Sequence, residues 1–568
     1  MKLNKFKAMV PAALLLAASV TSCMDDLDKG NIDPTVQAEP DLTALYSKCY
    51  ACLILEGMDG NADFKSDDNG KTTFIRNVFN ANVLSTDEGI CWWTDGGLED
   101  YGKNTPKPNS DAIRFLYYRL IMDISYCNHY LELDGAQADP TKLAEVRFIR
   151  AYLYYQMLDL FGDPAFIPAV SSEMPRQAHA YNDKFQEGMS RSEMLALGRQ
   201  FLFGWVENEL KTAEANLMAP QPKTDSDPNY GRVDKAAAWL MLSRLYLNAG
   251  TYLNNDGQNN PYWAQALEYA EKVINSGYTL FDESKMSAAA KGNGYKPYDL
   301  LFMGDNGSNG SSVEALFPLI QNGSTTRSYG CTRFLINGST NNSEMMNPDG
   351  KSVGTNSDDQ WSGNRARPQL IEKFFDNTDV TKDLHAYQMP AAAGDDRAIF
   401  EANGRKITND DQKTFTDGYA VCKWNNWRTD GGQRSDDKFV DTDYFLMRSA
   451  ESYLILAEAD ARLNGGRTTA EGTKAIDALL NRANDKKLVK ASYNLDDICD
   501  EWSREFYWEG LRRPTLIRFG RFSGNSDYTW SWKGGVLSGR NVDSHYYLFP
   551  LPQDDLNANR NLKQNPGY

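Results

Sequence analysis

The chain has 568 residues, of which 12% are aromatic, and its formal net charge is −17 at pH 7. This acidic balance argues against a nucleic-acid-binding protein, because contact with phosphates needs a clustered basic face. An acidic surface is suited to a soluble domain that binds a neutral ligand.

The N-terminal residues 1–22 predict a secretory signal peptide. A lysine-containing start precedes the apolar run 9–20, which is shorter than the roughly 20 apolar residues of a membrane-spanning helix. Cys23 follows Thr21 and Ser22, so the segment resembles the lipobox of bacterial lipoproteins, in which the cysteine receives lipid. An ordinary signal peptide with a chance cysteine is the alternative.

Residues 23–40 are predicted to form a flexible tether behind the lipidated cysteine. Asp25 and Asp26 come almost directly after Cys23 and resemble an export tag that sends some Bacteroidetes lipoproteins to the outer face of the outer membrane. A plain acidic tether is the alternative. We expect residues 41–568 to form a single domain.

Beyond the tether, apolar residues recur at the i, i+3, i+4, i+7 spacing of amphipathic helices. Asp234 is the expected N-cap of one helix, and Gly250 and Gly277 follow the expected ends of two. The predicted helices are 42–55, 140–161, 234–249, 263–276, 447–463, 475–483 and 495–519.

The helical segments 236–247 and 264–274 form a pair, and the second resembles the second half of a tetratricopeptide unit. The stretches 57–107 and 280–439 are instead irregular, and 280–439 is rich in glycine, asparagine, serine and aspartate. Long irregular stretches in a compact protein usually carry function. The predicted fold is therefore mainly α, a scaffold of tetratricopeptide-like helical pairs with loop-rich insertions that carry the ligand site.

The seven cysteines other than Cys23 are odd in number and scattered along the chain. Cys49 and Cys52 form a C-x-x-C pair, but no second cysteine pair and no histidine pair accompanies them. A zinc site is therefore not predicted. We expect buried free thiols.

Neither a G-x-S-x-G nor an H-E-x-x-H motif is present, and carboxylates are the remaining catalytic candidates. A glycosidase needs two carboxyl groups that face each other, about 5 to 9.5 Å apart. The side chains of Asp87 and Glu88 should diverge, and Glu505 and Glu509 point the same way from one helix. Because several arginines lie beside the second pair, we interpret it as an ion-pair network that braces the C-terminal helix. We predict no catalytic residue.

Three aromatic residues stand out because they lie in the irregular stretches. Trp93 lies beside a Thr-Asp-Gly-Gly sequence, and Tyr329 and Trp361 lie among serine and glycine. Flat rings in an arc suit the apolar face of a pyranose ring, and a stacked ring contributes about 0.5–1.5 kcal/mol by analogy with aromatic pairs. Filler between helices is the alternative interpretation of these rings.

Five blocks resemble the SusD/RagB family of nutrient-binding outer-membrane lipoproteins, in order and spacing along essentially the whole mature chain. The blocks are AEVRFIRA through LFG (144–162), GRVDKAAA through LYLNAG (231–250), RSAE through AEA (448–459), EWSREF through EGLRR (501–513), and FPLP to QNPGY (549–568). The similarity is greatest to the starch-binding founder of that family, through the segments 86–88, 415–418, 423–426 and 530–535.

The resemblance implies a helical tetratricopeptide-like scaffold without catalysis, and a glucan site on its outward face. Matched residue by residue, the aromatic arc of that site is Trp93, Tyr329 and Trp361. Asp68 and Arg76 match polar contacts to the sugar.

Two further implications concern single positions. An asparagine that contacts sugar in the founder falls on Gly96 here, which removes one partner for a sugar hydroxyl. The founder's calcium site maps onto Asp441 and Asp443, with Asp305 nearest the third carboxylate, and oxygen ligands of this kind suit calcium. No cofactor is otherwise expected.

The predicted function is a lipid-anchored surface protein that binds starch or maltooligosaccharides and delivers them to a SusC-like TonB-dependent transporter. Another glycan, such as a fructan or a host oligosaccharide, is the alternative within this class. A glycoside hydrolase and a transporter subunit without a ligand of its own are the alternatives outside it.

Overall fold

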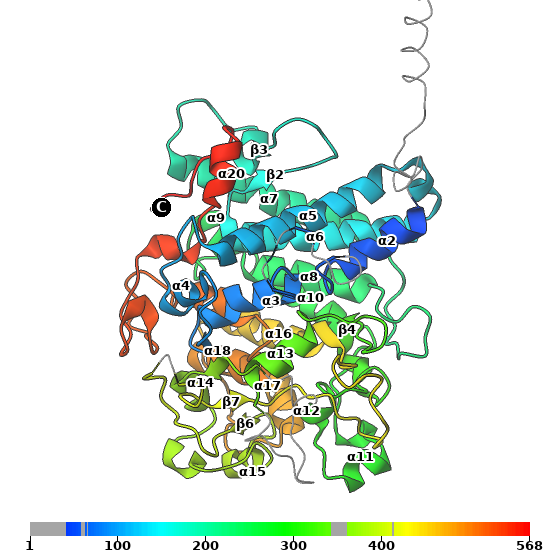
Figure 1. The fold of residues 1–568 in the computed structure, drawn as a ribbon, viewed down its shortest axis with the longest axis vertical. Helices are drawn as coiled ribbons and strands as arrows, with labels where there is room; N and C mark the ends of the chain where they lie inside the picture. Colours follow the sequence, from blue (N-terminus) through cyan, green and yellow to red (C-terminus); the bar gives the residue numbers. More distant parts are fainter. Residues whose placement is uncertain (1–40, 58–62, 65, 67, 342–360, 412–413) are drawn as a thin grey trace, which may run out of the picture. The chain divides into compact units, whose positions relative to one another are not determined.

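The structure is a computed structural model that describes residues 41–57, 63–64, 66, 68–341, 361–411 and 414–568 (Figure 1). The chain divides into two compact units, Met1–Leu45 and Tyr46–Tyr568. The predicted signal peptide, the lipidated Cys23 and the tether lie outside the described residues. The single domain 41–568 stays a prediction. No helix in the described ranges is long and apolar enough to cross a bilayer.

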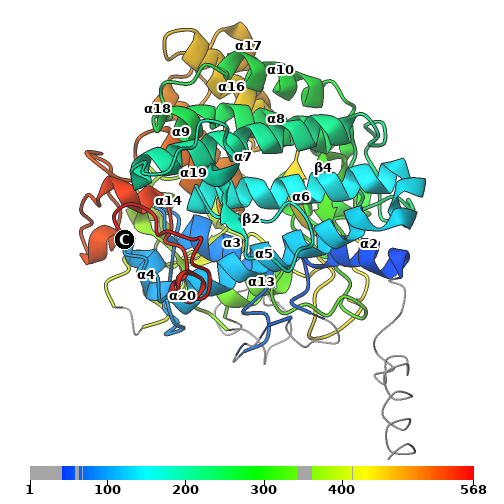
Figure 2. The same cartoon turned by 90° about the horizontal axis from the view of Figure 1, so that it is seen from above.

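The fold is mainly helical, as predicted, and its long helices pack side by side (Figure 2). Helix α5 packs on α6, α6 on α7, α8 on α10, α10 on α16, and α16 on α17. These helices and their close neighbours are α5 (Asp111–Glu132), α6 (Pro140–Phe161), α7 (Arg191–Glu214), α8 (Lys235–Leu247), α9 (Ala249–Asn254), α10 (Trp263–Ile274), α16 (Ala450–Leu463), α17 (Ala470–Arg482), α18 (Leu495–Phe506) and α19 (Arg512–Arg518).

Capping residues fix the ends of these helices, as the sequence indicated for several of them. The Asp139 carboxylate accepts a hydrogen bond from the backbone N–H of Lys142, and α6 ends where Gly162 adopts a φ of 74°. The Asp234 carboxylate accepts from the N–H of Ala236 and caps α8. Gly250 does not follow a helix end, because the chain turns at Asn248 and continues as α9.

Several predicted helices are wrong in extent. Helix α2 (Leu42–Ala51) ends before the predicted residue 55, and α17 begins at Ala470, before the predicted residue 475. The first residues of the predicted helix 447–463 belong to strand β8, and α16 begins only at Ala450. The predicted helix 495–519 is two helices, α18 and α19. Between them Trp508 and Gly510 adopt φ angles of 66° and 78°, which a continuous α-helix does not allow.

The described residues also contain short helices and four two-stranded antiparallel sheets, which pair as β1–β5, β2–β3, β4–β8 and β6–β7. Strands β1, β4, β5, β6 and β7 lie in the stretches that the sequence indicated as irregular. The strands are β1 (Gly89–Cys91), β2 (Ala165–Phe166), β3 (Arg176–Gln177), β4 (Ala315–Leu319), β5 (Asn364–Ala366), β6 (Phe400–Glu401), β7 (Ala420–Val421) and β8 (Tyr444–Arg448). The short α-helices are α2 (Leu42–Ala51), α3 (Phe74–Phe79), α4 (Leu98–Lys103), α11 (Ala288–Gly292), α12 (Pro297–Leu300), α13 (Thr332–Ser339), α14 (Pro368–Ile371), α15 (Met389–Ala393) and α20 (Gln553–Ala558).

The short 3-10 and π segments complete the element order. They are η1 (Asn80–Leu84), η2 (Asp134–Ala138), η3 (Ala178–Tyr181), η4 (Glu283–Lys285), η5 (Ser311–Glu314), η7 (Thr378–Thr381), η8 (Lys533–Gly535) and η9 (Ser544–Tyr547).

The seven described cysteines are buried and free, as predicted. Burial raises the pKa of the Cys52 thiol well above its usual value, which keeps the thiol protonated and unreactive.

Candidate functional site

Strands β1 and β5 bring two of the three predicted aromatic residues together. Gly89 pairs with Ala366 and Cys91 with Asn364, so the residues after β1 meet the residues before β5. The ring centroids of Trp93 and Trp361 lie 6.4 Å apart at an interplanar angle of 58°. Both side chains are half-buried, so each is partly accessible to solvent.

Tyr329 joins the two tryptophans through a buried arginine. The Arg333 guanidinium carbon lies 4.3 Å from the ring centroid of Tyr329 and 5.3 Å from that of Trp361. Arg333 is fully buried in α13, directly after the loop that carries Tyr329. Arg333 therefore links Tyr329 to Trp361, and Trp361 in turn lies beside Trp93. We call Trp93, Tyr329 and Trp361 the aromatic arc.

Glycines allow the rings to lie close to the backbone. A Cβ atom added to Gly363 would lie 2.2 Å from Nε1 of Trp93, and one added to Gly70 would lie 2.7 Å from Cβ of Tyr329. Hydrogen bonds fix the loop that carries Trp361, because its backbone N–H donates to the carbonyl of Asn337 at the end of α13 (2.8 Å).

Two neighbouring cations lower the pKa of the Tyr329 hydroxyl. Burial alone would raise the pKa of Tyr329, but hydrogen bonds from Lys438 and Arg333, together with their positive charge, lower it below its usual value. A phenol with a lowered pKa is a stronger hydrogen-bond donor. Lys438 is exposed, and its Nζ lies 5.3 Å from the centroid of the Tyr329 ring.

Polar side chains surround the Trp93 end of the arc. The guanidinium carbon of the buried Arg76 lies 5.3 Å from a ring centroid of Trp93. Arg76 forms ion pairs with Asp95 at 3.4 Å and with Asp68 at 3.9 Å. Asp68 is exposed, so its carboxylate is accessible beside the arc. The structure thus brings the predicted residues Asp68 and Arg76 next to Trp93.

Gly96 is exposed in the same loop but provides no side chain. A Cβ at this position would lie 3.1 Å from the carboxylate of Asp111, so a larger residue would need that carboxylate to move. The backbone carbonyl of Gly96 is already used, because it accepts a hydrogen bond from the N–H of Ala112 at 3.1 Å.

Sequence reasoning missed three residues of this region. Arg333 and Lys438 lie outside the motifs considered, and only their distance from Tyr329 shows their part in the site. Asp95 could have been predicted from the sequence, because it lies two positions after Trp93 in the same loop.

Two of the predicted calcium ligands accept hydrogen bonds from protein groups in this structure. The carboxylate of Asp443 accepts hydrogen bonds from the N–H of Gln321 and the hydroxyl of Tyr230, both at 2.7 Å. The carboxylate of Asp305 accepts from Thr429, at its N–H and its hydroxyl. In the part of the chain that the structure describes, no group of three or more His, Cys, Asp or Glu side chains is placed to hold a metal ion. Calcium binding through Asp441 and its two partners remains a prediction of the sequence.

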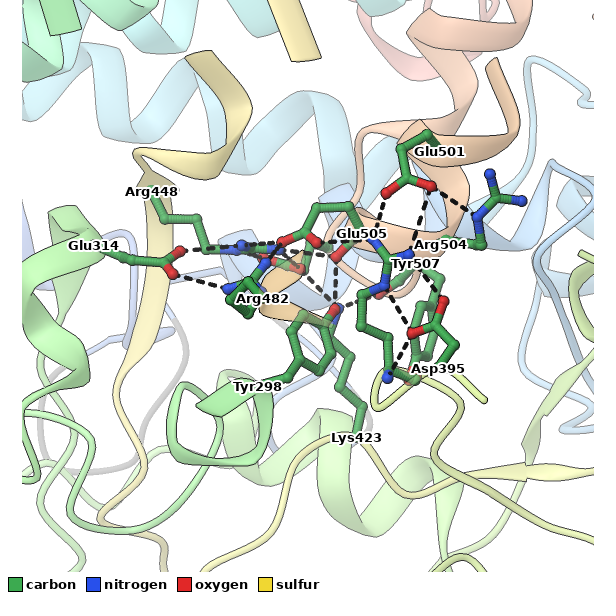
Figure 3. Close-up of polar contacts among 12 residues, drawn as sticks. Tyr298, Glu314, Asp395, Lys423, Arg448, Arg482, Glu501, Arg504, Glu505 and Tyr507 are labelled. Carbon is green, nitrogen blue, oxygen red and sulfur yellow. Dashed lines mark hydrogen bonds and ion pairs between the residues drawn. The ribbon is translucent and has the colours of Figure 1, made fainter. Parts of the chain in front are cut away.

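Of the carboxylates considered for hydrolysis, Glu505 and Glu509 belong to the ion-pair network that the sequence predicted, and Glu505 is fully buried (Figure 3). The Glu505 carboxylate lies 2.6 Å from Arg448 and 3.2 Å from Arg397, and it also pairs with Arg482. Arg448 extends the network to Glu509 at 2.7 Å.

The other pair, Asp87 and Glu88, is also buried, and the two side chains have different partners. The Asp87 carboxylate pairs with Arg512 at 2.7 Å. The Glu88 carboxylate accepts hydrogen bonds from the hydroxyl of Ser503 and the N–H of Trp508. All four carboxylates therefore have partners within the protein.

The chain is similar to known proteins in sequence and in fold. A model of the SusD family matches residues 337–568. The chain is 36% identical to Starch-binding protein SusD from Bacteroides thetaiotaomicron, and the alignment covers 100% of both chains.

Solved structures share the fold at low sequence identity. A SusD superfamily protein from Parabacteroides distasonis has a TM-score of 0.62 at 17% identity, and the match covers 94% of this chain and 100% of that one. Surface glycan-binding protein A from Bacteroides fluxus has a TM-score of 0.60 at 18% identity, with 93% and 98% covered.

Proposed function

Because the chain belongs to the SusD family, we propose that it binds starch and maltooligosaccharides at the cell surface and passes them to a SusC-like TonB-dependent transporter. It is a binding protein and not an enzyme. The full-length relative is named for starch binding, and this chain carries an aromatic arc that suits a glucan.

The observation that carries the proposal is that three half-buried rings lie in one region, because Trp93 lies beside Trp361 and Arg333 links Trp361 to Tyr329. Each ring offers an apolar face on which a pyranose can stack, and Asp68 and Arg76 beside Trp93 can hydrogen-bond the sugar hydroxyls. Two or three stacked rings give an affinity of roughly millimolar to micromolar.

The arrangement at the cell surface is part of the same proposal. Cys23 would carry lipid and anchor the protein to the outer membrane, with residues 24–40 as the tether. Several acyl chains hold a soluble domain firmly, since each buried CH₂ contributes about 0.8 kcal/mol.

Isothermal titration of maltoheptaose into the chain lacking residues 1–23 tests the binding step. We expect saturable binding that weakens at least tenfold in Trp93→Ala and in Trp361→Ala, a loss of about 1.4 kcal/mol or more. Trp239→Ala is the matched control, because Trp239 is a half-buried tryptophan in α8, outside the arc. Absence of binding to the unsubstituted chain would refute the proposal for starch.

A second candidate is the same role for another glycan, and Gly96 favours it because one hydrogen-bonding side chain is missing from the loop. A glycan array that includes fructans and host oligosaccharides separates the two candidates. Preferential binding to either of those classes, lost in Trp93→Ala, would keep the arc and change its ligand.

A further inference from the structure

A cavity of about 640 Å³ lies apart from the aromatic arc and shares no lining residue with it. Its walls are the segment 279–286, the segment between α11 and α12, part of α16 and the C-terminal half of α17 (Figure 1). Small-molecule sites in proteins have volumes of about 300–1,000 Å³. The cavity therefore has room for a mono- or disaccharide.

Asp396 lines this cavity with a carboxylate that lacks a protein partner. The residue is only 8% exposed. Its side chain forms no hydrogen bond or ion pair with any residue that the structure describes. Burial raises the pKa of Asp396 to about 6, and the Lys296 charge only partly opposes that rise. By contrast, the neighbouring carboxylate of Asp395 pairs with Arg397 at 2.8 Å (Figure 3).

The Asp396 oxygens are not among the fully enclosed unpaired atoms of the described residues, so they face the cavity and are open to a ligand. The two oxygens of Asp396 can accept hydrogen bonds from two neighbouring hydroxyl groups of one ligand. This bidentate acceptance matches the vicinal diol of a sugar.

Other residues of the cavity lining offer an apolar surface and an amide. Tyr453, on α16, is half-buried and lines the cavity, and its hydroxyl forms no hydrogen bond with the residues that the structure describes. Its ring and the buried Met286 give an apolar surface. Asn481, exposed on α17, adds an amide that both donates and accepts.

The charges around the cavity favour a neutral ligand. Lys285 is occupied, because its Nζ pairs with Asp282 at 2.8 Å and donates to the carbonyl of Leu280 at 2.7 Å. Arg482 is occupied by Glu314 at 2.8 Å and by Glu505. The remaining lysines of the lining, Lys291 and Lys296, are balanced by the carboxylates of Glu283 and Asp396, so an anionic ligand meets no net positive charge.

A cationic ligand is also disfavoured. Lys291 and Lys296 line the cavity and would repel an ammonium group that approached Asp396. A polyhydroxylated, uncharged ligand satisfies the carboxylate, the amide and the ring together.

We propose that this cavity is a second carbohydrate site, which takes a neutral mono- or disaccharide between the Asp396 carboxylate and the Tyr453 ring. The site is independent of the aromatic arc, so it stands whether or not the arc binds starch. It would hold a short sugar while the arc holds a longer chain.

The test uses the double variant Trp93→Ala/Trp361→Ala, in which the arc is disabled, and saturation-transfer NMR with glucose and with maltose. We expect saturable binding of at least one of the two sugars at millimolar concentration. Adding Asp396→Asn, which keeps the side-chain volume, should weaken that binding at least fivefold, and adding Tyr453→Ala should do the same.

Asp379→Ala is the matched control, because Asp379 is an exposed carboxylate paired with Lys382 and lies outside the cavity lining. Thermal unfolding of each variant confirms that it is folded. The proposal is overturned if the arc-disabled protein transfers no saturation to either sugar, or if folded Asp396→Asn binds as the double variant does. Neither result affects starch binding, which is measured on the unsubstituted arc.

Discussion

The indole of Trp93 lies directly against Gly363, where an added Cβ would come within 2.2 Å of its Nε1. Only glycine leaves space for the ring at this position. The first prediction uses this contact.

Gly363→Ala should displace Trp93 and weaken maltoheptaose binding about tenfold, or about 1.4 kcal/mol, while the protein stays folded. Isothermal titration measures the change. Gly204→Ala is the control, because a Cβ at Gly204 in α7 meets nothing within 4 Å and alanine favours a helix. Equal affinity of Gly363→Ala and the unsubstituted chain would show that Trp93 does not contact the sugar.

Starch binding should weaken at alkaline pH because of Tyr329. Its hydroxyl donates only while protonated, and hydrogen bonds from Lys438 and Arg333 lower its pKa although burial opposes them. The donor is therefore present at neutral pH and lost as the pH rises through that lowered pKa. We expect the Kd to increase between pH 7 and pH 10 by about threefold to tenfold, as for a net hydrogen bond of about 1 kcal/mol. Tyr329→Phe should bind weakly at all pH values and lack this dependence.

Glu505→Gln should destabilise the fold by about 3 kcal/mol or more, because it leaves buried arginines without their charge partner. Burial alone would raise the pKa of Glu505, but Arg482, Arg448 and Arg397 hold it well below its usual value. The stabilisation is thus present above the unfolded pKa of about 4.3 and lost as the pH falls through the folded pKa.

Urea denaturation at pH 7 measures the Glu505→Gln effect. Glu99→Gln is its control, since Glu99 is an exposed partner of Lys103 and such i, i+4 pairs contribute about 0.3–0.5 kcal/mol. Equal losses in the two variants would contradict the structural role of the network.

Glu88→Gln should have the opposite effect and stabilise the protein at high pH. Burial raises the pKa of Glu88 to about 8, against the charges of Arg512 and Lys423. This folded pKa exceeds the unfolded value of about 4.3. The contribution of Glu88 to the free energy of unfolding is therefore fully present below about pH 4.3 and is lost as the pH rises through 8. The variant should therefore match the unsubstituted chain near pH 4 and be about 1–2 kcal/mol more stable at pH 9. Denaturation at the two pH values decides this, and a variant less stable at pH 9 would contradict it.

Local signals predicted the helices that have clear caps. Helix α6 has the predicted bounds because Asp139, Pro140 and Gly162 mark its ends. Helix α7 was missed although Ser190 and Glu193 form a capping box at its start. Its interior mixes polar and apolar residues, so its 3.6-residue period is weak. The break between α18 and α19 was missed because the positive φ of Trp508 depends on packing. No local residue pattern predicts it.

Only part of the candidate site could be predicted from the sequence. The arc aromatics stood out because they lie among small polar residues, and family similarity put Asp68 and Arg76 beside them. The contacts of Arg333 depend on the meeting of α13, the loop before β5 and the Phe439 loop, which lie far apart in the chain. Such long-range contacts follow from tertiary packing and have no local signature.

The strand pair β1–β5 joins chain segments that lie on opposite sides of a long intervening sequence, and Trp93 and Trp361 are 268 positions apart. A partly folded chain cannot hold both indoles together. The proposed sugar site therefore forms only when folding is complete. Sugar binding consequently stabilises the native state by RT ln(1 + [L]/Kd), where [L] is the free sugar concentration. If the chain binds sugar as proposed, the free sugar concentration around it would therefore set how much of the protein stays folded.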